Sequence, residues 1–118
     1  MAGQEVNGSG SERIEVEAHD GCVVVRPYGE MDVARAKDFR EALLGALSDA
    51  SRADQVVVDL QHLTFCDSTG LYVLMDARAA AAEHGWRLYL AAPRDQFIRL
   101  LEITGSLDLF TIEPAPPF

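Results

Sequence analysis

Apolar and polar positions alternate with the period of a β-strand near the start of the chain. The apolar members of segment 14–18 are separated by Glu15 and Glu17, the pattern of a half-buried strand. His-Asp-Gly at 19–21 supplies turn chemistry, and the β-branched segment 22–28 follows it. These two segments should therefore pair as an antiparallel hairpin.

A helical pattern follows this hairpin. Asp32 is the predicted N-cap of a helix that runs to about Ala50. The spacing predicts one apolar side for that helix, made by Val33, Ala36, Phe39, Leu43, Leu44 and Leu47.

Strand and helix patterns then alternate to the end of the chain. Segment 56–60 is a nearly continuous apolar run, typical of a central strand covered on both faces. A helix is expected over 68–84, a strand over 86–92 and a short helix from about 95 to 105. A last strand is expected over 109–112. The order ββαβαβαβ predicts an α/β domain, a mostly parallel β-sheet with an N-terminal hairpin strand and helices packed on it.

The two ends of the chain differ from this domain. Residues 1–12 are mostly polar and predict a flexible arm, residues 13–113 form one domain, and residues 114–118 are a proline-rich tail. The arm lacks the basic start and apolar run of a secretory signal, and no later segment is long enough to span a bilayer. We therefore expect a cytoplasmic protein without membrane contact.

Charge and cysteine content narrow the function further. The formal net charge is −9 and the ten basic residues are not clustered, so direct binding of nucleic acid is not expected. Cys22 and Cys66 are the only cysteines, and without a signal peptide we expect two reduced thiols. A redox role for Cys66 is a minor alternative, since it borders the segment described next.

The most informative segment is 59–71, which runs from the buried strand through a loop into a helix. Ser68 lies at or next to the helix N-cap, where a hydroxyl has an ordinary capping role. The same helix end could also hold a phosphate, because its free N–H groups and dipole favour negative charge. The two roles are compatible.

No enzyme constellation accompanies this serine. The sequence has no Gly-x-Ser-x-Gly elbow, no Cys/His spacing suited to zinc and no phosphate-cradling loop ending in Gly-Lys. A receiver domain phosphorylated on Asp67 is disfavoured, because the first strand ends in a hairpin turn and Lys37, the only lysine, lies on a helix. We therefore expect neither catalysis nor a cofactor or metal.

Three separated segments carry a resemblance to a known family. Asp-Ser-Thr-Gly at 67–70 lies between a strand and a helix, Gly-Glu-Met-Asp at 29–32 precedes the first helix, and Arg-Leu-Leu-Glu-Ile-Thr-Gly at 99–105 ends the last helix. Over about residues 12–112 the chain resembles the anti-sigma factor antagonist branch of the STAS (sulphate transporter and anti-sigma antagonist) domain family. Thr69 stands where a second serine is common in that family.

The resemblance implies a partner switch. The unphosphorylated protein would bind a serine-kinase anti-sigma factor and release a sigma factor, phosphorylation of Ser68 would end binding, and a phosphatase would reset it. The expected partner-binding residues are Asp32, Asp67, Ser68, Thr69 and Gly70. Gly70 would let a partner or phosphate approach the backbone closely, while the two aspartates could equally be solvated caps or turn residues.

One departure and two alternatives stay open. Such antagonists usually have a further helix after the last strand, whereas prolines follow here at 114, 116 and 117, so a partner or a homodimer could cover that part of the sheet. Within the same fold, the chain could instead be a scaffold or accessory subunit of a stress-signalling or transporter complex. A nucleotide-binding module is a third possibility.

Overall fold

The computed structural model describes residues 4–7, 12–48 and 53–117. Each strand and helix expected from the sequence is present. The elements are β1 Gln4–Asn7, β2 Ile14–His19, β3 Gly21–Pro27, β4 Gly29–Met31, α1 Val33–Ser48, β5 Ala53–Asp59, β6 Leu63–Cys66, α2 Ser68–Glu83, β7 Arg87–Ala91, α3 Asp95–Ile103, the short 3₁₀ helix η2 Leu107–Leu109 and β8 Thr111–Glu113. Three short strands, β1, β4 and β6, were not predicted.

The main sheet has the strand order β1-β2-β3-β5-β7-β8. The pairs β1–β2 and β2–β3 are antiparallel, and β3, β5, β7 and β8 run parallel. The predicted N-terminal hairpin on a mostly parallel sheet is therefore confirmed. The segment 4–7 lies within the arm expected to be flexible, and it forms a strand on the edge of the sheet.

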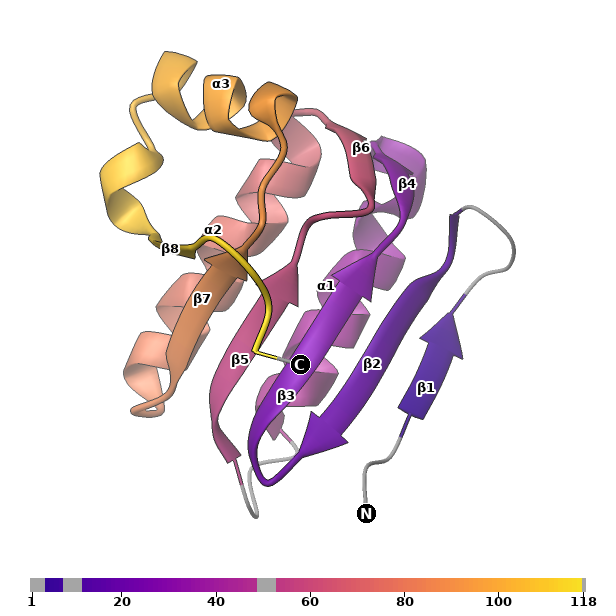
Figure 1. Ribbon diagram of the computed structural model, residues 1–118, viewed down its shortest axis with the longest axis vertical. Coiled ribbons are helices and arrows are strands. Elements are labelled where there is room, and N and C mark those ends of the chain that lie inside the picture. Colours follow the sequence, from indigo (N-terminus) through magenta and orange to yellow (C-terminus); the bar gives the residue numbers. More distant parts are fainter. Residues whose placement is uncertain (1–3, 8–11, 49–52, 118) are drawn as a thin grey trace.

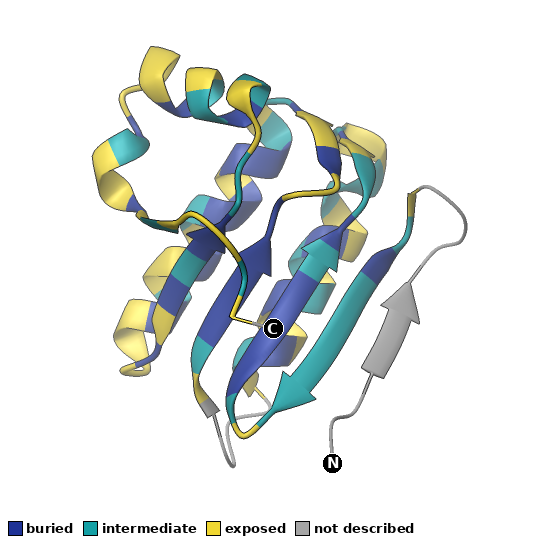
Figure 2. Ribbon diagram, in the orientation of Figure 1, coloured by how far each residue is buried: buried dark blue, intermediate teal, exposed yellow. Residues whose placement is uncertain are grey.

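Two helices cover one face of this sheet. Figure 1 shows α1 and α2 behind β2, β3, β5 and β7. Valines that alternate along β3 and β5 point to this side and form the main core with Phe39, Leu43, Leu71 and Leu74. Figure 2 shows the resulting contrast between buried central strands and helices whose outer surfaces are exposed. The alternation of strand residues explains this, since successive side chains face opposite sides.

The opposite face of the sheet has a smaller apolar cluster of Cys22, Val24, Val57 and Ala91. Residues 114–117 are not helical. In Figure 1 the segment after β8 passes in front of the sheet, on the side away from α1 and α2. The described residues that follow β8 thus form no helix, in keeping with their prolines.

The predicted apolar side of α1 is partly wrong. Phe39 and Leu43 are buried as expected, but Val33 is 75% exposed and Leu44 is 41% exposed. The structure describes α1 as far as Ser48, and the predicted end at about Ala50 lies outside the described residues. Val33 is the first residue of α1, and at this helix end periodicity alone overstates its burial.

A second, two-stranded sheet lies beyond the carboxyl ends of β3 and β5. In it, β4 and β6 pair in parallel, with Met31 opposite Cys66. Residues 63–66, which were expected in a loop, form β6, so that expectation is wrong. This small sheet leads directly into α1 and α2, so it determines where both helices begin (Figure 1). None of the helices in the described ranges is long and apolar enough to cross a membrane.

Candidate functional site

The first turns of α1 and α2 form the site. The amide of Asp67 donates to the carbonyl of Met31 over 3.1 Å, which extends the β4–β6 pairing by one bond. Because α1 begins two residues after Met31 and α2 begins one residue after Asp67, the two helix N-termini lie side by side. Asp32 and Asp67 therefore occupy equivalent places, each one residue before the start of its helix.

Both aspartates are helix caps. Oδ1 of Asp67 accepts from the backbone N–H groups of Thr69 at 2.9 Å and Gly70 at 3.3 Å. Oδ1 of Asp32 accepts from the N–H of Ala34 at 3.0 Å, which confirms its predicted capping role. Each carboxylate satisfies N–H groups that the helix itself cannot.

Ser68 is next to the cap and is not the cap. It is the first helical residue of α2, and the capping oxygens belong to Asp67. A capping role for the Ser68 hydroxyl is therefore wrong. The residue is exposed, so the hydroxyl is available to a partner, whereas Thr69 is half-buried.

Gly70 serves the protein's own packing. It is buried, and a Cβ at this position would lie 2.6 Å from Sγ of Cys66 and 2.8 Å from Cγ of Met31. The close approach expected at Gly70 is thus to the β4–β6 sheet, and its N–H is already bonded to Asp67. Glycine lets the first turn of α2 lie directly on that sheet.

Three exposed apolar side chains lie on α1, β6 and α2, the elements that meet near Ser68. Tyr72 is one helical turn further along α2 and is 60% exposed, Phe65 on β6 is 43% exposed, and Val33 is at the start of α1. Residues four apart on a helix share a face, so Tyr72 lies beside Ser68. We refer to Ser68, Val33, Phe65 and Tyr72 as the Ser68 surface.

Cys66 is a buried residue at the end of β6, two residues before Ser68. It is fully buried and free, as is the buried Cys22, in agreement with the expected reduced thiols. Burial, reinforced by the negative charge of Asp67, raises the pKa of the Cys66 thiol to about 12. The thiol stays protonated at neutral pH, which argues against a redox role because the thiolate is the reactive form.

Gln96, which was not predicted from the sequence, holds the strand that enters the site. Its side-chain oxygen accepts from the N–H of Cys66 and its side-chain nitrogen donates to the carbonyl of Cys66, each over 2.9 Å. Gln96 lies in the first turn of α3, thirty residues away along the chain. No local pattern in the sequence marks such a contact.

A partly buried ion-pair network lies on the face of the sheet away from α1 and α2. Nε of Arg26 is 2.8 Å from Oδ2 of Asp59, which is fully buried, and Nη1 of Arg26 is 2.7 Å from Glu17 and 3.2 Å from Glu15. Burial opposes the charge of Arg26, but hydrogen bonds to Asp59, Glu17 and Glu15 outweigh it and raise its pKa. The sequence offered one signal of this network, an arginine at the end of the valine run of β3, since a buried charge needs a partner.

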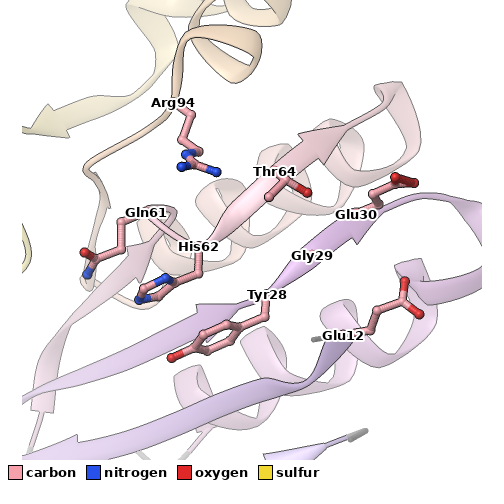
Figure 3. A pocket seen from close by; sticks show the side chains of 8 residues that line it. All are labelled: Glu12, Tyr28, Gly29, Glu30, Gln61, His62, Thr64 and Arg94. Atoms are coloured by element: carbon pink, nitrogen blue, oxygen red, sulfur yellow. The ribbon is translucent and has the colours of Figure 1, made fainter. Parts of the chain in front are cut away.

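A groove lies beside the β4–β6 sheet (Figure 3). It has a volume of about 520 Å³ and is lined by Glu12, Tyr28, Gly29, Glu30, Gln61, His62, Thr64 and Arg94. The rings of Tyr28 and His62 stack at 4.5 Å, and the Arg13 guanidinium lies 3.8 Å from the centre of the Tyr28 ring. Carboxylates and Arg94 both line the groove, so it favours neither sign of ligand charge strongly.

Arg35 fixes the wall of this groove to α1. Its guanidinium donates to the carbonyls of Tyr28 at 2.7 Å, Glu30 at 2.5 Å and Glu12 at 2.6 Å. These bonds hold the β3–β4 connection in place just before Asp32. The positively charged guanidinium in the first turn of α1 is therefore already hydrogen-bonded within the protein.

The fold and the site define a small α/β protein that presents an exposed serine at a helix N-terminus, beside a second helix N-terminus. The chain belongs to the STAS domain family, whose model matches residues 13–116. The anti-sigma-B factor antagonist of Staphylococcus aureus is 31% identical over 99 residues, which cover 84% of this chain and 90% of that protein.

Two solved structures share the fold. A putative anti-sigma factor antagonist from Thermotoga maritima matches with a TM-score of 0.76 at 19% identity and covers 85% of each chain. The Bacillus cell fate determinant SpoIIAA in its phosphorylated form matches with a TM-score of 0.61 at 16% identity, covering 95% of this chain and 92% of that one. These likenesses confirm the predicted STAS-like α/β architecture.

Proposed function

We propose that this protein is an anti-sigma factor antagonist switched by Ser68. In the unphosphorylated state it binds an anti-sigma factor that is itself a serine kinase, and a sigma factor is released. Phosphorylation of Ser68 inactivates it. The observation that carries the proposal is the exposed serine at the first position of α2, in a chain 31% identical to a protein named as an anti-sigma-B factor antagonist.

Charge explains why phosphorylation would end binding. A phosphate adds about −1.5 to −2 charges at neutral pH, and here it would stand beside the carboxylates of Asp67 and Asp32. The N–H groups that could bind it at the start of α2 already donate to Asp67. Arg35, in the first turn of α1, is engaged with three carbonyls. The phosphate would thus keep its charge facing the partner.

The Ser68 surface supplies the contact area for the unphosphorylated state. Exposed aromatic and apolar side chains are typical anchors of protein interfaces, and Phe65, Tyr72 and Val33 are exposed on the strand and helices that meet near the serine. A dianion on this surface must lose its hydration when a partner covers it. Repulsion from acidic neighbours and this desolvation cost act in the same direction.

The proposed partner roles of the acidic residues are indirect. Asp32 and Asp67 hold the two helix N-termini and contribute negative charge beside Ser68, and Thr69 and Gly70 donate their N–H groups to Asp67. A phosphatase is needed to reset the switch, because the negative charge persists until the ester is cleaved. We place this cycle in the cytoplasm, where the kinase would find its nucleotide.

A capture experiment followed by phosphopeptide mapping tests the proposal. Unmodified protein on a column should retain a kinase-fold partner from the source cells, and added ATP should place phosphate on Ser68. Phosphate on Thr69 in equal or greater amount would show that the wrong hydroxyl has been chosen. A scaffold or transporter subunit would instead retain its partner equally well before and after phosphorylation.

A further inference from the structure

The end of β6 is held on two sides by different means. On one side it pairs with β4, and on the other the side chain of Gln96 bonds both the N–H and the carbonyl of Cys66 at 2.9 Å. A primary amide offers one acceptor and two donors, so Gln96 replaces the peptide group of an adjacent strand. An otherwise unpaired strand edge is satisfied by a single residue of α3.

This clamp acts one residue before the cap of α2. Cys66 is fully buried, and a buried peptide group that loses its hydrogen bonds pays the full cost of desolvation. Without Gln96 both polar groups of Cys66 on that side would need water, and the chain entering α2 would shift to admit it. Asp67, whose amide is bonded to Met31, and then Ser68 would move with it.

We propose that Gln96 is a positioning residue for Ser68: its amide fixes the end of β6 so that the Ser68 hydroxyl is presented to the kinase in one geometry. The inference rests on the proposed function of Ser68. It also gives α3 a role, since a movement of α3 would reach the Ser68 surface through this amide.

The chemistry of the clamp requires glutamine. Glutamate has the same length but is an acceptor only when ionised, so it would repel the Cys66 carbonyl. Methionine has a similar shape and can replace neither bond. Gln96→Glu therefore removes only the donor to the Cys66 carbonyl. Gln96→Met removes both this donor and the acceptor for the Cys66 N–H. Leu100→Ala is the matched control, because Leu100 packs partly buried on the same helix and makes no contact that holds Cys66.

The experiment has two readouts at a temperature where all variants are fully folded by circular dichroism. Amide hydrogen exchange reports whether Cys66 is held, and phosphorylation of Ser68 by the kinase captured on the unmodified protein reports its presentation. For both Gln96 variants we expect kcat/KM for phosphorylation to fall about tenfold, and for Gln96→Met, which also removes the acceptor of the Cys66 N–H, we expect Cys66 exchange to accelerate at least tenfold. In Leu100→Ala, kcat/KM should stay within twofold of wild type.

Two results would overturn the inference. One is a Gln96→Met protein that is phosphorylated at the wild-type rate, and the other is an equal loss of kcat/KM in Leu100→Ala, which would make the effect one of general stability. A wild-type protein that the kinase leaves unmodified overturns the proposed function instead. In that case the exchange rate at Cys66 still decides whether Gln96 holds β6.

Discussion

Replacing Asp67 by alanine should destabilise the domain far more than replacing Ser68 by alanine. Asp67 accepts two backbone bonds at the start of α2, whereas the capping residue of that helix is not Ser68. The comparison separates two neighbouring residues that both have capping side chains. It also tests whether Ser68 contributes little to folding stability, as we expect of a switch residue.

The magnitude follows from capping energetics. Loss of an aspartate N-cap costs about 0.5–2 kcal/mol, and its charge at the positive helix end contributes about 0.3–1 kcal/mol. We expect Asp67→Ala to lower the free energy of unfolding by about 1–2 kcal/mol, or the melting temperature by roughly 4–8 °C. Ser68→Ala should change stability by less than about 0.5 kcal/mol, as for most exposed positions.

Urea denaturation at pH 7, followed by circular dichroism, measures both variants. Asp67→Asn is the control, because asparagine caps nearly as well as aspartate and removes only the charge. It should recover most of the lost stability. Equal destabilisation by Ser68→Ala and Asp67→Ala would refute the assignment of the cap, and so would a stable Asp67→Ala protein.

Three further predictions concern the packing, protonation and thiols around the site. Gly70→Ala should lower the free energy of unfolding by about 1–3 kcal/mol through overpacking, since its Cβ would lie 2.6 Å from Sγ of Cys66. In the same urea melts, Gly45→Ala should raise the free energy of unfolding by about 0.5–1 kcal/mol, because its Cβ meets nothing within 4 Å. The hydrogen bond from Arg26 lowers the pKa of Glu17 from 4.5, so the contribution of Glu17 to folding stability is complete above about pH 4.5 and is lost as the pH falls through the folded-state pKa. Glu17→Gln should therefore lose melting temperature less steeply than wild type as the pH is lowered. An unchanged slope of melting temperature against pH would contradict this. The thiol of Cys66, with its pKa raised to about 12, should react with a disulfide reagent at pH 8 only as fast as the protein unfolds, and immediate labelling of the folded protein would be the opposite result.

The strands of the main sheet other than β1 could be predicted because their patterns are local. Alternation over 14–18 and the valine runs of β3 and β5 each specify a strand without reference to the rest of the chain. Gly29–Met31 has three residues and Leu63–Cys66 has four, too few for a period to emerge. Their strand character comes from pairing with each other, which the sequence does not display.

The sequence located the candidate site, but apart from the cap at Asp32 it did not specify the contacts within it. The segment 67–70 contains aspartate, serine and threonine in succession, all capping residues, so the sequence leaves the helix start uncertain by one position. Side-chain contacts across the fold were invisible for a different reason. Arg26 meets Asp59 thirty-three residues away, and Gln96 meets Cys66 thirty residues away.

The affinity of the phosphorylated protein for its kinase partner tests the central claim most directly. Unmodified protein, enzymatically phosphorylated protein and the Ser68→Ala variant should be titrated into the partner by calorimetry at equal ionic strength. Like charges brought together at an interface cost several kcal/mol, so we expect phosphorylation to weaken binding at least about a hundredfold, with Ser68→Ala binding as the unmodified protein does. Equal affinity of the phosphorylated and unmodified forms would contradict the account.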